Sequence, residues 1–471
     1  RILQGTAMFK IFNHYFRRRI ILQIAMYSMV IVSTLIVSLA LQGGVGVFNG
    51  AVISSGVIRG GVMAIGIIGV NFALGLYDRP GKLTIGQVRA RAVLSFVLSM
   101  IIAASILLLL PLQPPYQNEQ TLIALLLIVG GMLVMRLLGN EMLPSSYTRQ
   151  RVLIYGTGGR ASIVGQSLLE NDPSIELIGY FRGPQEKGPV IQGLNVITPG
   201  KTLTDVVREQ RVNEIVVALS ERRGGSMPLR ELLDCKLQGI RVIDLATHFE
   251  QLLGQIHLEA VSAGWLIFGD GFKQGLVRSV VKRLFDIVGS GILLLVSSPV
   301  MLVTALLIFI ESGRPIFYRQ ERVGRNGDVF DVIKFRSMRQ DAEKDGTPRW
   351  AGAGDTRVTR VGKIIRKMRI DELPQLFCVL KGDMSLVGPR PERPYFVERL
   401  TLDIPYYALR HGIKPGLTGW AQVRYHYGAS IKDAEQKLQY DLYYVKNHSW
   451  LLDLIILFET VGVVLTGKGA Q

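Results

Sequence analysis

Four apolar runs, each about 20 residues long, constrain the fold of this chain more than any other feature of its sequence. They cover residues 20–42, 57–77, 92–112 and 121–139. A helix needs roughly 20 apolar residues to cross the ~30 Å hydrocarbon core of a bilayer. The runs therefore predict a bundle of four transmembrane helices within residues 8–145. Residues 1–7 lack an initiator Met and resemble a vector-derived remnant, with Met8 as the expected natural start.

Positive charge lies on alternate sides of these runs. Three arginines precede the first run, loop 78–91 carries four Lys or Arg residues, and two arginines follow the fourth run. Loops 43–55 and 113–120 carry none. Because cytoplasmic loops retain Lys and Arg, this pattern predicts that both ends of the bundle face the cytoplasm. The runs contain no acid or His that suggests a proton relay, so we expect an anchor.

The composition points to membranes and anionic partners. Of 471 residues, 48% are hydrophobic and 19% charged, and the net charge is +17. Such a balance favours a membrane protein that meets anionic lipid headgroups or phosphorylated substrates. Nucleic acid is not expected, because the sequence has no zinc finger, RNA-recognition motif or basic zipper. Cys235 and Cys378 are the only cysteines, which excludes a disulfide framework and fits a reducing cytosol.

The pattern changes near residue 151 to strand, tight turn and helix. We expect strands at residues 152–155, 176–180, 214–219 and 241–245, and helices at 161–170 and 203–210. Together they predict a Rossmann-like α/β domain over residues 150–255. The glycine turn Gly156-Thr157-Gly158-Gly159 could cradle a dinucleotide, but the second strand ends in Phe181-Arg182 without the acid that would bind a ribose. We therefore favour a structural or regulatory role over a redox cofactor, and leave the ligand open.

A second long apolar segment, residues 284–310, has Ser297-Ser298-Pro299 at its middle. A straight crossing would carry the arginines that follow it to the outer face, against the preference of positive charge for the cytoplasm. Proline inside a helix removes one hydrogen bond, and a Ser hydroxyl can satisfy the freed carbonyl. We expect a re-entrant helix over residues 282–312 that breaks at Ser298-Pro299. The alternative is a fifth span with a proline kink.

Two adjacent acids, Asp371 and Glu372, stand where a helix should begin. Asp371 is a good N-cap, and Pro374 is tolerated in the first helical turn. The start of a helix favours a bound phosphate, and two acids there make sense if a metal joins them or if one attacks phosphorus. Basic residues that would hold the anion surround the pair: Lys334, Arg336, Arg357, Arg360, Lys363, Arg366, Lys367, Arg390 and Arg393.

Seven motifs occur in order in the C-terminal half. They are Lys282-Arg283 with Asp286, Ser298-Pro299, Lys334-Phe335-Arg336-Ser337-Met338, Asp371-Glu372-Leu373-Pro374-Gln375-Leu376, Gly388-Pro389-Arg390-Pro391, Gly416-Leu417-Thr418-Gly419-Trp420-Ala421-Gln422-Val423 and Asp441-Leu442-Tyr443-Tyr444. The chain resembles the bacterial polyprenyl-phosphate hexose-1-phosphate transferases of the monotopic phosphoglycosyltransferase superfamily. The resemblance covers about residues 282–471. The four spans and the α/β domain are similar to the large members that initiate exopolysaccharide or O-antigen synthesis.

The resemblance implies a mostly helical catalytic domain over residues 272–471, on the cytoplasmic face of a bacterial inner membrane. It implies that Asp371 attacks the β-phosphate of a UDP-sugar and expels UMP, and that polyprenyl (undecaprenyl) phosphate then takes the sugar phosphate. A carboxylate nucleophile divides one transfer into two steps, which agrees with the residues present. Glu372, with Asp371 beside it, would bind Mg²⁺, a hard cation that takes carboxylate and phosphate oxygens. The oligomeric state stays open, with a homodimer among the options.

The substrate and phosphate contacts implied are Lys334, Arg336, Arg357, Arg390, Arg393 and Asp441. Five of the six have a simpler alternative. Lys334 and Arg336 could face anionic lipid, Arg390 and Arg393 could form a surface ion pair with Glu392, and Asp441 could cap a helix or pair with Lys437.

Two other functions remain open at this point. A membrane-bound nucleotide-sugar dehydratase or epimerase can share the spans and the α/β domain, although no Tyr here has a Lys four residues later to form the usual base pair. A non-catalytic scaffold of polysaccharide assembly is the other. The sequence does not specify the sugar or the polymer.

Overall fold

The fold is taken from a computed structural model. It describes residues 8–12, 14–42, 50–77, 85–110, 118–137, 150–171, 175–183, 195–197, 200, 202–219, 227–261, 263–268, 271–272, 275–339, 357–425, 428 and 430–466. The chain forms two compact units, one made of Arg1–Ile11 and Tyr15–Leu252 and the other of Phe12–His14 and Leu253–Gln471. The expected remnant at residues 1–7 and the loops at 43–49, 78–84 and 111–117 lie outside the described residues.

The predicted apolar runs are helices in the first unit. They are α1 (Arg18–Gln42), α2 (Gly50–Ala73), α3 (Ile85–Leu109) and α4 (Asn118–Leu137). α1, α2 and α3 are long and apolar enough to cross a membrane, whereas the apolar stretch of α4, Glu119–Val134, is shorter. On α2, a Cβ at Gly56 would lie 2.6 Å from Ile36 Cγ1, and one at Gly60 would lie 3.0 Å from Val32 Cα. Two glycines four residues apart thus let α1 approach closely, as small residues do in membrane bundles.

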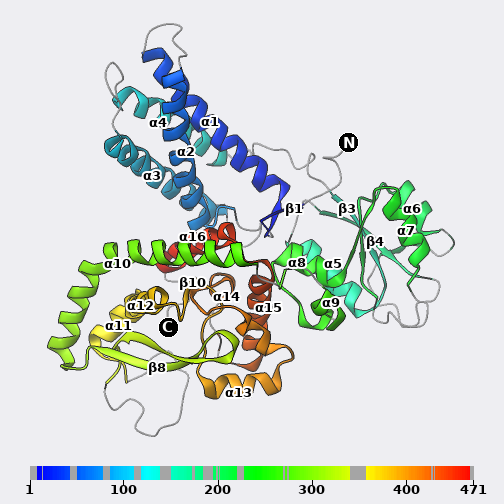
Figure 1. Cartoon of the computed structure of the whole chain (residues 1–471). Coiled ribbons are helices and arrows are strands. Elements are labelled where there is room, and N and C mark those ends of the chain that lie inside the picture. The colour runs from blue at the N-terminus through cyan, green and yellow to red at the C-terminus, as the bar shows by residue number, and fades with distance from the viewer. Residues whose placement is uncertain are drawn as a thin grey trace. The chain divides into compact units, whose positions relative to one another are not determined.

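The first unit also holds a five-stranded parallel sheet (Figure 1), in the order β5-β4-β3-β6-β7. The strands are β3 (Gln150–Tyr155), β4 (Ile175–Phe181), β5 (Val196–Ile197), β6 (Glu214–Val217) and β7 (Arg241–Asp244), and the helices α5 (Gly159–Asn171), α6 (Leu203–Glu209), α7 (Leu229–Leu237) and α8 (Leu245–Leu253). Alternate residues such as Leu153 and Tyr155 pack with α6 and α7 in a buried core, and α5 covers the other face. The four expected strands and two expected helices are confirmed; β5, α7 and α8 were not predicted. A short two-stranded sheet, β1 (Met8–Ile11) and β2 (His14–Arg17), precedes α1.

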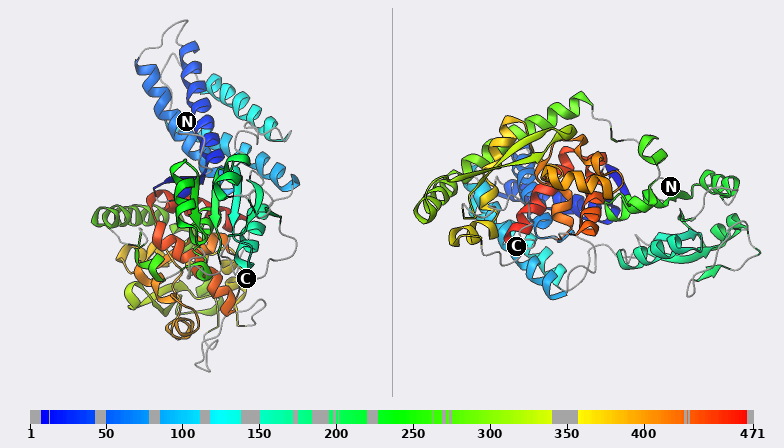
Figure 2. Two further views of the ribbon diagram at one scale, coloured as in Figure 1. Left: turned by 90° about the vertical axis from the view of Figure 1, so that its right-hand side faces the viewer. Right: turned by 90° about the horizontal axis from the view of Figure 1, so that it is seen from below.

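The second unit is mostly helical. Its elements are η2 (Leu258–Ala260), α9 (Ala263–Phe268), α10 (Leu276–Ser312), β8 (Phe317–Val323), η3 (Arg325–Gly327), β9 (Val329–Phe335), α11 (Arg360–Lys367), η4 (Ile370–Glu372), α12 (Gln375–Lys381), β10 (Ser385–Val387), α13 (Pro394–Asp403), η5 (Tyr407–Gly412), β11 (Gly416–Thr418), α14 (Trp420–Arg424), α15 (Ile431–Asn447) and α16 (Trp450–Thr466). β8 and β9 form a long antiparallel hairpin (Figures 1 and 2), and β10 pairs in parallel with β11.

α10 is the longest helix, with 37 residues and Pro299 inside it. Figure 1 shows that it turns sharply partway along, so that it has two arms. The predicted break at Ser298-Pro299 is wrong in one respect, because the helix continues through the proline. Pro299 cannot donate to the carbonyl of Leu295 four residues earlier, and Ser298 Oγ supplies that carbonyl with a donor at 2.8 Å. Because the Ser298 hydroxyl takes the place of the missing proline N–H, the helix can bend without leaving the Leu295 carbonyl unsatisfied.

Both ends of α10 are fastened within the second unit. Near its start, Arg283 donates to the carbonyls of Val379 and Leu380 at 2.7 and 2.6 Å, where α12 ends. Near its end, Glu311 accepts from the backbone N–H groups of Arg360 and Val361 at 2.8 and 3.1 Å, where α11 begins. The positive Arg283 satisfies carbonyls at the C-terminus of α12, and the negative Glu311 satisfies N–H groups at the N-terminus of α11. Each charge is the one that the helix dipole favours at that end.

Candidate active site

The acidic pair lies in a short 3-10 turn, not at an N-cap. α11 ends at Lys367, Arg369 adopts a left-handed conformation (φ 59°), and Asp371 and Glu372 follow in η4. α12 starts at Gln375 after Pro374, so the helix begins four residues later than Asp371. The expected N-cap is therefore wrong. The backbone continues in tight i to i+3 turns, Leu373 N to Ile370 O at 3.1 Å and Phe377 N to Pro374 O at 3.1 Å, and in this run Pro374 need not donate.

Cationic side chains, not a long helix terminus, surround the pair. Arg390 reaches Glu372 with both guanidinium nitrogens, Nη2 to Oε1 at 2.6 Å and Nη1 to Oε2 at 3.4 Å. Arg369 Nη1 lies 3.5 Å and Lys334 Nζ 3.9 Å from the same Oε1. Burial alone would raise the pKa of Glu372, but Arg390, Lys334 and Arg369 hold it well below its usual range. Glu372 is therefore ionised at any physiological pH.

Asp371 has a different environment, although it is the next residue. It is buried, with 9% of its surface exposed, and within the described part of the chain its Oδ1 has no hydrogen-bond partner. Burial and the neighbouring charge of Glu372 raise its pKa to about 6, against the opposing effect of Lys334, Arg366 and Arg369. Adjacent carboxylates whose environments separate their pKa values often have different chemical roles. Here one acid is bound by cations and the other keeps a free lone pair.

The two acids supply two candidate ligands for a metal ion. Among the described residues there is no group of three His, Cys, Asp or Glu side chains that could bind an ion by themselves. Mg²⁺ commonly takes one or two carboxylates and completes its shell with water and substrate phosphates. A carboxylate has two oxygens, so Asp371 could offer one of them to an ion and still keep its unpartnered Oδ1. The residues present therefore fit an ion that arrives with a diphosphate.

Of the two predicted phosphate contacts on or beside β9, Lys334 lies at the acidic pair and Arg336 contacts the end of α10. Lys334 on β9 faces Glu372, and burial lowers its pKa to about 8, although Glu372 opposes the shift. Arg336 lies just after β9 and turns to the end of α10, where its Nη2 donates to Ser312 O at 2.7 Å and Gly313 O at 2.8 Å. This contact caps the helix. The structure thus brings Lys334 to the dyad. Arg336 Nη2 binds the end of α10, while its Nε and Nη1 have no partner among the described residues, and its phosphate role stays a prediction.

Asp441, a predicted substrate contact, is buried beside an arginine that the motifs did not indicate, and its substrate role stays a prediction. Its Oδ2 lies 2.8 Å from Arg410 Nη2, and both side chains are buried, with 3% and 6% exposed. Arg410 comes from η5 and was not among the predicted residues. No motif surrounds it, and only its spacing of three from Tyr407, whose hydroxyl it reaches at 2.8 Å, could have suggested a buried cation.

Arg357 and Arg393 both lie in the second unit. Arg357 accepts a backbone hydrogen bond from Arg339 beside the Met338–Val358 bridge, and Arg393 precedes α13 at its N-cap position. Glu392, the alternative partner predicted for Arg393, lies 3.5 Å from Arg322 Nη1. The substrate roles of Arg357 and Arg393 stay predictions.

Known proteins match this chain over the unit that holds the site. Residues 277–467 match the bacterial sugar transferase family. A UDP-N-acetylgalactosamine-undecaprenyl-phosphate N-acetylgalactosaminephosphotransferase of Aeromonas hydrophila is 45% identical over 242 residues, which is 51% of this chain and 56% of the Aeromonas protein. A UDP-glucose:undecaprenyl-phosphate glucose-1-phosphate transferase of Xanthomonas campestris is 32% identical over 331 residues, 68% of each chain. The matched part thus spans little more than half of the first relative and two thirds of the second.

The chain belongs to the bacterial sugar transferase family. Within this class, the resemblance to polyprenyl-phosphate hexose-1-phosphate transferases that the motifs indicated is confirmed. Family membership favours a transferase over the dehydratase, epimerase and scaffold hypotheses.

Proposed function

We propose that the enzyme transfers a hexose-1-phosphate from a UDP-sugar to undecaprenyl phosphate and releases UMP, the first step in building an exopolysaccharide or O-antigen. The names of the Aeromonas and Xanthomonas relatives support the acceptor and the donor class. One is named for N-acetylgalactosamine and the other for glucose, so we assign a UDP-hexose and leave its substituent open.

The reaction would run through Asp371 in two displacements. In the first, a carboxylate oxygen of Asp371 bonds to the β-phosphorus of the donor, and the bond from that phosphorus to the bridging oxygen breaks, so that UMP leaves with the electron pair. In the second, a phosphate oxygen of undecaprenyl phosphate bonds to the same phosphorus and the aspartyl oxygen–phosphorus bond breaks. The observation that carries this assignment is the buried Oδ1 of Asp371, for which the described residues offer no donor. A carboxylate oxygen without hydrogen bonds keeps its lone pair for attack.

Residues around Asp371 would bind and orient the donor. Lys334, Arg369 and Arg390 supply three positive charges beside the two negative charges of Glu372 and the ionised Asp371. The surplus favours a diphosphate, and it also stabilises the charge that develops on UMP as it leaves. Glu372 fixes the three cations in place, so little reorganisation is needed when the substrate binds.

We propose Mg²⁺ as the cofactor, held by Glu372 and Asp371 together with the donor diphosphate. When bound, it would supply charge neutralisation at the phosphates. Asp371 keeps a second oxygen for phosphorus, and neighbouring residues of a tight turn point in different directions, so the two acids can approach a phosphate from two sides.

We also propose that α10 is re-entrant and that the second unit lies on the cytoplasmic face of the inner membrane, with anionic lipids around it. Long apolar side chains are exposed along both arms, among them Leu284, Val296 and Phe309. A 37-residue helix without a bend would be about 55 Å long, well beyond the hydrocarbon core. The contacts of Arg283 and Glu311 hold both ends of α10 on the same compact unit, which supports return to the face of entry.

For residues 150–255 we propose a Rossmann-like domain with a structural or regulatory role. The strand order β5-β4-β3-β6-β7 supports this, since it matches the first five positions of the order 3-2-1-4-5-6. The glycine turn follows β3, the first strand of the sheet in sequence.

The test is to incubate the purified protein with UDP-hexoses, undecaprenyl phosphate and Mg²⁺, and to measure UMP and lipid-linked sugar. We expect both products in equal amounts, and neither from Asp371→Asn. Asp403→Asn is the matched control, because Asp403 is exposed at the end of α13. Equal activity of wild type and Asp371→Asn would refute the assignment.

A further inference from the structure

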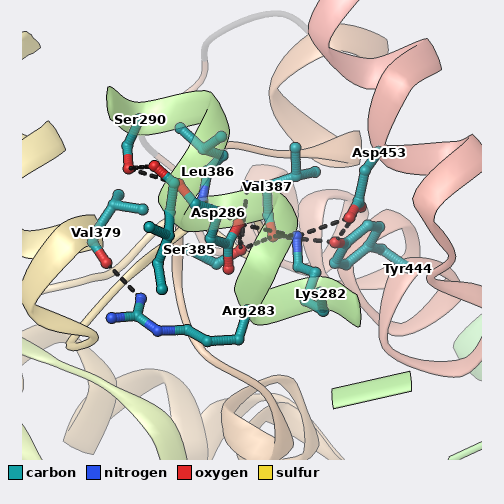
Figure 3. A network of polar contacts seen from close by, with 11 residues as sticks. Lys282, Arg283, Asp286, Ser290, Val379, Ser385, Leu386, Val387, Tyr444 and Asp453 are labelled. Carbon is teal, nitrogen blue, oxygen red and sulfur yellow. Dashed lines mark hydrogen bonds and ion pairs between the residues drawn. The ribbon is translucent and has the colours of Figure 1, made fainter. Parts of the chain in front are cut away.

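A buried carbonyl links α10 to the strand that leads into the site. The carbonyl oxygen of Val387, the last residue of β10, has three possible donors around it (Figure 3). Lys282 Nζ lies at 3.1 Å, Tyr444 OH at 3.0 Å and Ser385 Oγ at 2.9 Å. Three residues after Val387 the chain reaches Arg390, whose side chain binds Glu372.

The hydrogens available decide which donor holds this carbonyl. A hydroxyl has one hydrogen, and each of the two hydroxyls also has a carboxylate within reach. Tyr444 OH lies 2.6 Å from Asp453 Oδ1, and Ser385 Oγ lies 2.9 Å from Asp286 Oδ1. A carboxylate is the stronger acceptor, so it takes the hydroxyl hydrogen in each case. Lys282 is then the donor that remains for Val387.

Lys282 has as many hydrogens as acceptors. Its ammonium group carries three N–H bonds. The acceptors are Asp453 Oδ2 at 2.7 Å, the Val387 carbonyl at 3.1 Å and Asp286 Oδ1 at 3.5 Å. Figure 3 shows Lys282 between them. Two buried acids therefore orient the ammonium group toward the backbone of β10.

The other end of the segment 387–390 is fixed as well. Arg410 Nη2 donates to the carbonyl of Arg390 at 2.8 Å, and the same nitrogen lies 2.8 Å from Asp441 Oδ2. Between the ends, Gly388 N donates to Thr418 O and Pro389 O accepts from Gly416 N, both at 2.9 Å. The segment is packed so closely that a Cβ on Gly388 would lie 2.5 Å from Lys414 O. A segment bonded along its length in this way transmits a displacement at Val387 to Arg390.

We propose that Lys282 and Arg410 are positioning residues for the transfer reaction. They fix the two end carbonyls of segment 387–390 and so place the Arg390 guanidinium on Glu372. The inference rests on the proposed function, because it assigns their effect to the step that Arg390 assists. A misplacement of catalytic groups by about 1 Å can lower a rate on the order of 100-fold.

The test separates positioning from support of the fold. Lys282→Met leaves Asp453 buried without its cation and should lower the melting temperature. The double variant Lys282→Met/Asp453→Asn removes that charge and should recover most of the melting temperature, because the other acid, Asp286, keeps its hydrogen bonds from Ser385 Oγ and Leu386 N. We expect its kcat to stay about 10-fold or more below wild type, with KM for the UDP-sugar changed less than about threefold. Lys381→Met is the control, since 74% of the Lys381 side chain is exposed.

A double-mutant cycle tests the route through Arg390. In the background of Arg390→Lys, which cannot make the two-point contact with Glu372, adding Arg410→Met or the Lys282/Asp453 double variant should reduce kcat no further. Full recovery of kcat in the stable double variant, or effects that multiply with Arg390→Lys, would overturn the positioning role. If wild type released no UMP, the proposed function would fail, and this inference with it; recovery of kcat in an active enzyme would remove the inference alone.

Discussion

Arg390 Nη2 lies 2.6 Å from Glu372 Oε1, while Asp371, one residue earlier in the chain, has a buried oxygen to which the described residues donate no hydrogen bond. One acid is thus paired with cations, and the other keeps an oxygen available for reaction. The contrast arises because neighbouring side chains of a tight turn point in different directions. It predicts opposite changes in the melting temperature when either acid is replaced by its amide.

Asp371→Asn should abolish transfer and stabilise the protein. The pKa of Asp371 is raised from 3.8 to about 6 by burial and Glu372. The folded state therefore binds this proton more tightly than the unfolded state, and the stability it contributes below pH 3.8 is lost as pH rises through about 6. At pH 7.5 the ionised side chain destabilises the fold by about 3 kcal/mol, which the amide removes. Thermal unfolding should occur several degrees higher, and a lower melting temperature would contradict this.

Glu372→Gln should also abolish transfer but lower the melting temperature. The cations around Glu372 depress its pKa, so its contribution is present above pH 4.5 and is lost as pH falls through the lower folded-state pKa. Loss of the acid removes the buried carboxylate that these three cations share, which costs about 3 kcal/mol. The difference from wild type should shrink in acid. Glu398→Gln, at an exposed position of α13, is the control. A melting temperature equal to that of wild type at pH 7.5 would argue against the cation cluster.

The rate of UMP release in a single turnover without lipid acceptor should depend on pH in a bell-shaped way. Asp371 must be ionised to attack, so the rate should rise through about pH 6. Lys334, with a pKa lowered to about 8, should lose its charge above that pH and weaken phosphate binding. Lys334→Arg should remove the alkaline limb and keep the acid limb, because arginine stays protonated. A flat profile between pH 5 and 7 would contradict the role of Asp371.

Pro299→Ala should straighten α10 and disturb its topology. With the N–H restored, Leu295 O regains its helical partner and the reason for the bend is gone. A reporter fused after Gln471 should then appear partly on the outer face, whereas in wild type it should stay inside. Ser298→Ala should destabilise the bend by about 1 kcal/mol, since it removes the replacement donor. Ser297→Ala is the control, as Ser297 Oγ contacts only Met301 Sδ at 3.6 Å among its polar neighbours described. An unchanged reporter in Pro299→Ala would count against re-entry.

Features governed by local chemistry could be predicted from the sequence. The apolar runs, the strands of the parallel sheet and the donor role of Ser298 follow from hydropathy, periodicity and proline stereochemistry. The start of α12 was predicted too early in the chain. Asp371 and Pro374 are compatible with the first turn of an α-helix, but they are equally compatible with the tight turn that precedes α12. Contacts between distant residues could not be predicted. Asp441 lies 31 residues from Arg410 in sequence, and Ser385 lies 99 residues from Asp286. The contact of Arg336 Nη2 with the end of α10 could not be predicted either, because the motif does not show that Ser312 lies next to it.

The most direct test of the account is to look for the sugar phosphate on Asp371. The enzyme is mixed with a UDP-hexose radiolabelled in its β-phosphate, without undecaprenyl phosphate, then quenched in acid and digested. The account predicts about one label per enzyme on the peptide that carries Asp371, an equal burst of UMP, and loss of the label when the lipid phosphate is added. Continued transfer with no label on that peptide, and UMP released only when the acceptor is present, would contradict it.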